Sequence, residues 1–179
     1  YTYAGANGKS VNNYDRRYRG FTTLREALTD SINIVTVKTL AQAGVSLGWQ
    51  YVQEYGFTTV DSRDMNEALA LGGITQGVSN LELTAAYAAI ANQGTYIKPK
   101  FYTKILDHDG NVLIDNTTPE SHTVIKDTTA WLLTSAMEDV MTSGTGTSAY
   151  FGSSMAQAGK SGTTTSSRDA LFAGYTPYY

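Results

Sequence analysis

Residues 18–33 read YRGFTTLREALTDSIN and contain the start of a helix, its apolar face and its end. Thr23 and Glu26 have the spacing of a capping box, in which each side chain satisfies a free backbone N–H of the other residue. The apolar stripe of this helix consists of Leu24, Ala27 and Leu28. The helical pattern then breaks at Ser31-Ile32-Asn33. The stretch therefore predicts a helix that begins near Thr23 and a turn at residues 31–33.

The same signals predict further helices downstream. One ends at Gly44, and another spans residues 49–55. A second capping box, Ser79 with Glu82, opens a helix. Its apolar stripe is expected to consist of Leu81, Ala85, Ala88 and Ala91. A last helix starts near Asp127. Its inward-facing residues are expected to be Leu132, Leu133, Ala136, Met137, Val140 and Met141.

Strands are predicted in the second half of the chain. Residues 104–106 and 112–114 flank a turn around Gly110 and indicate a hairpin. Residues 159–166 are small and threonine-rich, and residues 170–175 alternate weakly, so both segments indicate strands. Helices first and strands last favour an α+β fold with helices on one side of a sheet.

Composition excludes several classes of protein. The chain has 179 residues, about one domain, and its net charge of −3 gives no general attraction to nucleic acid. It has no cysteine, and its two histidines are too few for a His-rich zinc site, so no metal and no cofactor are expected. No apolar stretch approaches the roughly 20 residues that cross a bilayer, so this chain alone is expected to be soluble.

Residues 159–164 read GKSGTT and have two interpretations. Gly-Lys-Ser ends a phosphate-binding P-loop, but that loop requires a glycine where this chain has Ser154. A P-loop lysine also opens a helix, whereas the threonines that follow favour a strand. A P-loop nucleotide-binding protein is therefore a remote alternative.

The second interpretation is the Lys-Thr/Ser-Gly strand of serine acyl-transferases. Lys160 would supply positive charge beside a substrate carboxylate, and Gly162 would leave room for substrate along the strand edge. The backbone N–H of Thr163 would face a developing oxyanion. The triplet requires an upstream Ser-x-Asn partner, which Ser31 and Asn33 supply. A simple N-cap role for the serine remains the alternative, because serine is a preferred N-cap residue.

Several blocks resemble class A (bifunctional) penicillin-binding proteins, and they occur in the order found in that family. They are Asn13-Tyr14-Asp15, residues 18–28, Ser31-Ile32-Asn33, residues 70–78, residues 91–96 with Pro99, Gly144-Thr145-Gly146, the Lys160 strand and residues 172–177. Together they cover nearly the whole chain and resemble the transpeptidase domain of the family. The resemblance implies a partial serine β-lactamase/DD-peptidase-like fold of the α+β class, with a helical subdomain and an incomplete antiparallel sheet.

The resemblance also implies an activity. Family members are peptidoglycan D,D-transpeptidases at the outer face of the bacterial plasma membrane, which cross-link stem peptides through a serine acyl-enzyme and bind β-lactams. By this resemblance, Ser31 would pass a proton to the leaving nitrogen, Asn33 would hold a substrate amide, and Lys160 would keep the site positive. The residues assigned to substrate and β-lactam binding are Ser161, Gly162, Thr163 and Thr164.

The sequence departs from the family pattern in three places. Ser161 stands where threonine is commoner, and Leu171 stands where the family usually has tryptophan. The larger departure is the nucleophile, which the family carries in a Ser-x-x-Lys segment upstream of Ser-x-Asn. No serine of this chain has a lysine three residues later.

We therefore expect residues 1–179 to be part of a single transpeptidase domain, with the Ser-x-x-Lys segment and C-terminal strands missing. Such a chain is expected to be inactive alone. A sheet edge left open would invite a complementary chain of the same domain or a second copy. A non-catalytic peptidoglycan-binding or scaffold fragment is the alternative function.

Overall fold

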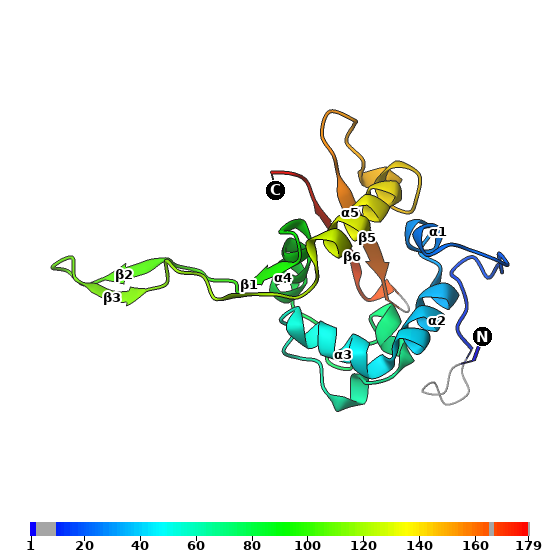
Figure 1. Ribbon diagram of the computed structural model, residues 1–179, viewed down its shortest axis with the longest axis horizontal. Helices are drawn as coiled ribbons and strands as arrows, with labels where there is room; N and C mark the ends of the chain where they lie inside the picture. Colours follow the sequence, from blue (N-terminus) through cyan, green and yellow to red (C-terminus); the bar gives the residue numbers. More distant parts are fainter. Residues whose placement is uncertain (3–9, 165–166, 179) are drawn as a thin grey trace.

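The computed structural model describes residues 1–2, 10–164 and 167–178. Figure 1 shows a helical body, a long two-stranded arm that projects from it, and a pair of C-terminal strands beside the helices. The N-terminal segment lies at the end of the body that is farthest from the arm (Figure 1). The predicted strand residues 165 and 166 lie outside the described residues.

Helices and strands alternate in blocks along the chain. The α-helices are α1 (Leu24–Thr29), α2 (Asn33–Ala43), α3 (Val45–Glu54), α4 (Asn80–Ala91) and α5 (Asp127–Thr142). The short 3-10 helices are η2 (Ser62–Asp64), η3 (Glu67–Leu71) and η4 (Thr147–Ala149). The strands are β1 (Thr95–Ile97), β2 (Lys104–Leu106), β3 (Val112–Asp115), β4 (Ser121–Thr123), β5 (Ala158–Thr163) and β6 (Ala170–Tyr175).

The mixed helix-and-strand class predicted from the sequence is confirmed. Within the described ranges the strands form three two-stranded antiparallel sheets: β1 with β4, β2 with β3, and β5 with β6. In the last pair Lys160 lies opposite Ala173 and Gly159 opposite Gly174. Each of β5 and β6 therefore has one edge that pairs with no other described strand.

Both predicted capping boxes are present and set the starts of α1 and α4. The Thr23 hydroxyl accepts from the backbone N–H of Glu26, and the Glu26 carboxylate accepts from the backbone N–H of Thr23 at 2.8 Å. Ser79 and Glu82 make the same reciprocal pair. Gly44 ends α2 with a φ of 103°, a backbone conformation that residues with a side chain seldom adopt. Helix α3 begins at the next residue.

The predicted inward faces of α4 and α5 are partly wrong. The buried residues of α4 are Ala85, Ala86 and Ala89, whereas Leu81, Ala88 and Ala91 are exposed. In α5, Leu132 is 58% exposed. The face of α4 was wrongly predicted because tertiary contacts decide it. Ala85 and Ala89 pack against Tyr96 and Val124 and form a small core with them.

Helix α5 joins the N-terminal helices to the C-terminal strands, because it contacts both α1 and β5. The Arg25 guanidinium of α1 donates to the backbone carbonyl of Ser135 at 3.0 Å and to the Asp139 carboxylate at 2.6 Å. On the strand side, a Cβ at Gly159 would collide with the ring of Phe172 and crowd the sulfur of Met141. Glycine at this position therefore lets β5 lie close to α5.

The arm consists of the segment between β1 and β4. Its outer part is the predicted hairpin, in which β2 pairs with β3 around a turn that contains Gly110 at a φ of 86°. Every residue of β2 and β3 is exposed. The predicted turn around Gly110 is confirmed as well, and the backbone of His108 lies in that turn.

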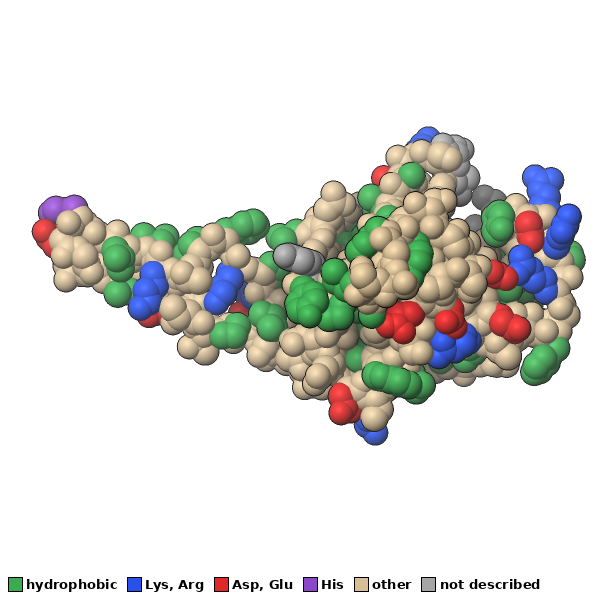
Figure 2. Space-filling view, turned by 90° about the horizontal axis from the view of Figure 1, so that it is seen from above, with side chains coloured by type: hydrophobic (Ala, Val, Ile, Leu, Met, Phe, Trp, Pro, Cys, Tyr) green, Lys and Arg blue, Asp and Glu red, His purple; other side chains and the backbone are tan. Residues whose placement is uncertain are grey.

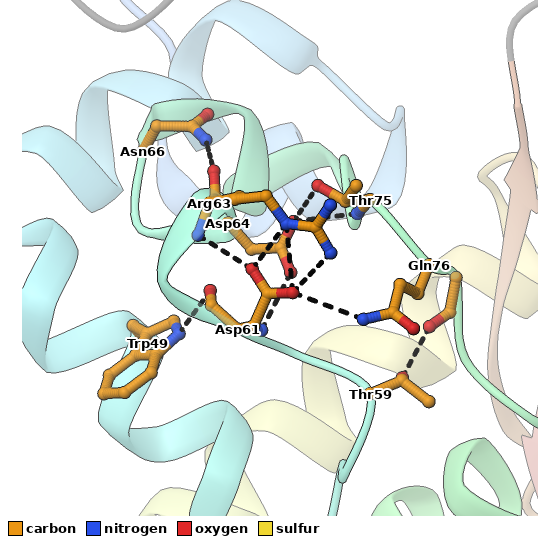
Figure 3. Close-up of polar contacts among 9 residues, drawn as sticks. Trp49, Thr59, Asp61, Arg63, Asp64, Asn66, Thr75 and Gln76 are labelled. Atoms are coloured by element: carbon orange, nitrogen blue, oxygen red, sulfur yellow. Dashed lines mark hydrogen bonds and ion pairs between the residues drawn. The ribbon is translucent and has the colours of Figure 1, made fainter.

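The connection between α3 and α4 is tied together by carboxylates (Figure 3). At its ends, the Glu82 carboxylate accepts from the backbone N–H groups of Thr58 and Ser79, and these bonds lower the pKa of Glu82 to about 2. In its interior, buried Asp64 accepts from the backbone N–H and the hydroxyl of Thr75 at 2.7 and 2.6 Å, and from Asp61 N–H at 3.0 Å.

The connection between α3 and α4 also packs against α2. Its 3-10 helix η3 packs on α2, where Ala70 contacts a buried cluster of Val11, Ile34 and Val37. Burial acts to raise the pKa of Asp64, but the hydrogen bonds from Thr75 and Asp61 outweigh it and leave the pKa below its ordinary value. The ionised carboxylate is thus the form that holds the connection in place.

Replacing Asp64 by asparagine tests this support. Both carboxylate oxygens of Asp64 accept hydrogen bonds, whereas the side-chain amide of asparagine has only one accepting oxygen. One buried donor would therefore lose its partner, and the free energy of unfolding should fall by about 1–3 kcal/mol. Urea unfolding at pH 7 measures the change. The difference from wild type should shrink as the pH falls below about 4, since a carboxylate with a lowered pKa stabilises only while ionised. The exposed Asp109→Asn control should change stability by less than about 0.5 kcal/mol; equal effects of the two substitutions would contradict the assignment.

Candidate active site

Ser31 lies in the turn between α1 and α2. Its φ is 54°, in the left-handed region that non-glycine residues seldom occupy. Ser31 N–H donates to the carbonyl of Leu28 at 3.3 Å, and Ile32 N–H donates to that of Ala27 at 2.8 Å. Ile32 occupies the N-cap position of α2, and its side chain makes no capping hydrogen bond. The alternative that Ser31 is a simple N-cap is therefore wrong, and its hydroxyl points elsewhere.

Lys160 of β5 contacts that hydroxyl. Its Nζ donates to Ser31 Oγ at 2.9 Å and to the backbone carbonyl of Ser161 at 2.9 Å. The predicted meeting of these two motifs, 129 residues apart in the chain, is present. The lysine side chain is partly buried, and burial lowers its pKa. The ammonium therefore gives up its proton more readily than that of an exposed lysine.

Asn33 begins α2 and is oriented by the N-terminal segment. Its Nδ2 donates to the backbone carbonyl of Asn12 at 2.9 Å, and it forms no hydrogen bond with Lys160 in the part of the chain described. Next to it, buried Asn13 accepts from the backbone N–H of Ile34 at 3.2 Å and donates to the carbonyl of Arg17 at 2.7 Å. Asn13 thus satisfies the start of α2 from a distant segment.

Asn12 and Asn13 are supporting residues whose roles were not predicted from the sequence. Asparagine is a preferred capping residue, but local patterns reveal caps only when cap and helix are adjacent. Asn13 caps a helix 21 positions away. The only signal was the resemblance of Asn13-Tyr14-Asp15 to the family, which assigned these residues no role.

The strand end beyond Lys160 presents hydroxyls and an open space. Ser161 Oγ donates to Thr145 Oγ1 at 3.3 Å. A Cβ at Gly162 would meet no atom within 4 Å, so packing within the described chain does not require glycine there. Thr163 is exposed. Thr164 is engaged in the loop that follows, where its Oγ1 accepts from the backbone N–H of Asp169 at 2.8 Å.

Gly144-Thr145-Gly146 is a close-packed turn. Thr145 N–H donates to the carbonyl of Thr29 at 3.2 Å, and Gly146 N–H donates to that of Val140 at 2.9 Å. A Cβ on Gly144 would overlap the Thr29 carbonyl, and one on Gly146 would crowd the sulfur of Met141. The turn therefore fixes the Thr145 hydroxyl beside Ser161.

The P-loop alternative is wrong. Gly159, Lys160 and Ser161 lie inside an antiparallel strand, and no helix begins at the lysine. Within the described residues, no group of three or more His, Cys, Asp or Glu side chains is placed to hold a metal ion. No helix in the described part of the chain is long and apolar enough to span a membrane.

A groove of about 780 Å³ lies elsewhere, between α4, α5 and β6. Half-buried Tyr87 and exposed Ala88 of α4 line one wall, and Leu171 and Phe172 of β6 line another. None of the predicted site residues lines this groove. The serine–lysine contact and the groove are therefore separate features of the molecule.

Comparison with known proteins gives one family. Residues 1–178 match the transpeptidase family described as "Penicillin binding protein transpeptidase domain". Penicillin-binding protein 1F of Bacillus subtilis (strain 168) is 39% identical over 171 residues, 92% of this chain and 23% of that protein. Penicillin-binding protein 1A of Clostridium acetobutylicum is 38% identical over 179 residues, 98% of this chain and 22% of that protein. The chain thus spans less than a quarter of the length of either relative.

Solved structures agree with the family match. The crystal structure of penicillin-binding protein 1A from Haemophilus influenzae superposes with a TM-score of 0.80 at 26% identity, covering 92% of this chain and 30% of that one. Penicillin-binding protein A from M. tuberculosis, solved as an imipenem acyl-enzyme complex, gives a TM-score of 0.78 at 18% identity, covering 93% of this chain and 42% of that one. The second likeness shows the fold alone.

The lowered pKa of Lys160 predicts an unusual pH dependence of stability. Between its folded pKa and the unfolded value of about 10.4, the unfolded state binds more protons, so stability rises with pH. The free energy of unfolding of the wild type, relative to Lys160→Met, should therefore increase as the pH rises from 7 towards about 10.

Lys98→Met is the matched control with the opposite sign. The hydrogen bond to Glu120 raises the pKa of Lys98, so this lysine stabilises the fold below about 10.4 and loses that effect at higher pH. Chemical unfolding of all three proteins from pH 7 to 11 measures both trends. The burial of Lys160 would be contradicted if the free energy of unfolding of the wild type, relative to Lys160→Met, stayed constant or declined across this range.

Proposed function

Because this chain belongs to the penicillin-binding protein transpeptidase family, we propose that it forms one wall of the acyl-transfer site of a peptidoglycan D,D-transpeptidase. The observation that carries the proposal is the hydrogen bond between Lys160 Nζ and Ser31 Oγ. It joins the Ser-x-Asn turn and the Lys-Ser-Gly strand, which are distant in sequence. A serine that accepts from a partly buried lysine, while keeping its own O–H to donate, is suited to proton transfer.

The proposed reaction has two steps. A serine oxygen attacks the carbonyl carbon between two D-alanines, the C–N bond breaks, and the leaving D-alanine takes a proton on its nitrogen. An amine of a neighbouring stem peptide then attacks the ester, and the serine is released. Ser31 would deliver the proton to the leaving nitrogen, and Lys160, with its lowered pKa, would return one to Ser31. The proton released by the attacking serine would then restore the lysine ammonium.

The strand end would bind the substrate carboxylate. Ser161 and Thr163 present hydroxyls, and the ammonium of Lys160 adds positive charge. The open space at Gly162 would hold the substrate along the strand, which explains a glycine that internal packing does not require. Asn33, fixed by Asn12, would hold the side-chain amide of the donor peptide. Thr164 would act indirectly, by fixing the loop after β5.

The nucleophile would come from a Ser-x-x-Lys segment, which these 179 residues do not contain. Alone, they should therefore hold the substrate-binding wall without the attacking serine. Stem peptides and β-lactams are the proposed ligands, no cofactor is invoked, and the outer face of the plasma membrane is the proposed location of the whole protein. The edges of β5 and β6 that pair with no described strand would receive the rest of the domain or a second copy.

Labelling with fluorescent penicillin tests whether the attacking serine lies outside these 179 residues. The 179-residue polypeptide should show no covalent adduct on a denaturing gel or by intact mass, because acylation requires a nucleophile with an adjacent base. The full-length protein should be labelled stoichiometrically, on a serine other than Ser31.

Two outcomes would contradict the proposal. A stoichiometric adduct on Ser31 would make that serine the nucleophile. A full-length protein that binds peptidoglycan but never takes the label would favour the non-catalytic alternative.

A further inference from the structure

The segment from Tyr14 to Phe21, here called the basic-aromatic loop, exposes an unusual set of side chains. Tyr14 and Tyr18 are each 72% exposed, and Phe21 is 98% exposed. Single exposed apolar residues are normal on protein surfaces, but here three large aromatic side chains are exposed within eight residues of sequence. Aromatic patches mark interaction sites, because their rings supply contact area at little entropic cost.

The same loop carries unpaired positive charge. Arg16 and Arg17 are exposed, and their guanidinium groups form no hydrogen bond or ion pair within the described residues. Arg19 differs, because it is paired with both Asp15 and Asp30. Figure 2 shows basic side chains, interspersed with acidic ones, at the end of the molecule that carries the N-terminal segment of Figure 1. In a chain of net charge −3, Arg16 and Arg17 therefore leave positive charge exposed on this loop, although the charge of Arg17 also acts on neighbouring Asp15.

The backbone of the loop is already ordered. Arg16 N–H donates to the carbonyl of Asn13 at 3.0 Å, and Arg17 N–H donates to the Asp15 carboxylate at 2.9 Å. The carbonyl of Arg17 accepts from the amide of Asn13. These bonds fix the loop before any ligand arrives, so binding would lose little conformational entropy.

The loop also borders the candidate active site. Arg19 is paired with Asp30, the residue directly before Ser31. Asn12 and Asn13, directly before the loop, bond Asn33 and the start of α2. These contacts join the loop to the turn that carries Ser31 and to the start of α2, where one end of a bound polymer would lie.

We propose that the basic-aromatic loop binds the glycan-linked, carboxylate-bearing stem peptides of an uncross-linked peptidoglycan strand, which extends our proposed function and rests on it. Arg16 and Arg17 would pair with peptide carboxylates, since guanidinium groups bind carboxylates in a bidentate manner. The rings of Tyr14, Tyr18 and Phe21 would lie against the apolar faces of the sugars. An anionic membrane is the poorer candidate, because lipid-binding segments carry about four to eight clustered basic residues.

The test uses the full-length protein and soluble, dye-labelled, uncross-linked peptidoglycan strands, with binding measured by fluorescence anisotropy. Arg16→Glu/Arg17→Glu should weaken binding about tenfold, as expected for loss of two exposed charge pairs and added repulsion. Strands whose carboxylates are amidated should bind the wild type as weakly as unmodified strands bind the variant. Lys98→Glu/Lys104→Glu on the arm makes the same change in charge and should alter binding by less than about twofold.

The outcomes separate this proposal from the proposed function. Equal binding of wild type and loop variant, or equal losses in the loop and arm variants, would overturn the proposal. So would loop-dependent binding to phosphatidylserine vesicles with unchanged binding to strands. Fluorescent penicillin should label wild type and loop variant at the same rate, because a small β-lactam does not reach the loop. Absence of label on both proteins would contradict the proposed function alone.

Discussion

A partly buried lysine ammonium must have acceptors, and in this chain Lys160 finds them in Ser31 Oγ and the carbonyl of Ser161. The first acceptor belongs to a turn 129 residues earlier, so the contact depends on how the two halves of the chain pack. That packing passes through α5, which contacts α1 on one hand and β5 on the other. Glycines at positions 144 and 159 allow both approaches, because a side chain at either position would overlap a neighbour.

The serine turn is held from several directions. Its left-handed backbone is a conformation that persists only when surrounding structure enforces it. Asn13 satisfies the start of α2, Arg19 pairs with Asp30, and the connection organised by Asp64 packs behind α2. Strain concentrated at a residue with many supports is common at functional sites. This support fits the proton-transfer role proposed for Ser31, which requires a hydroxyl held in one orientation.

Helix caps, helix ends and turns could be predicted from the sequence, whereas contacts between distant residues could not. The capping boxes at Thr23 and Ser79, the glycine end at Gly44 and the hairpin at Gly110 were predicted, because each depends on residues close together in the chain. The pairing of Ser31 with Lys160 was expected because a Lys-Ser-Gly strand of this kind requires an upstream Ser-x-Asn partner, and the order of the sequence blocks resembled that of a family. The buried face of α4 was missed, since an alanine-rich helix has small side chains on every side and tertiary contacts choose between them. The roles of Asn12 and Asn13 were missed for the same reason: their partners lie 21 positions away.

A double-mutant cycle on Ser31 and Lys160 tests the central claim, that these two side chains act as one proton-transfer unit. The second-order rate of acylation by penicillin would be measured for the full-length wild type, Ser31→Ala, Lys160→Met and the double variant. Each single substitution should slow acylation strongly, and the double variant should be about as slow as the slower single variant, because residues that act together give non-additive losses. Losses that simply multiply in the double variant would mean that the two side chains act independently, whatever their contact in the structure.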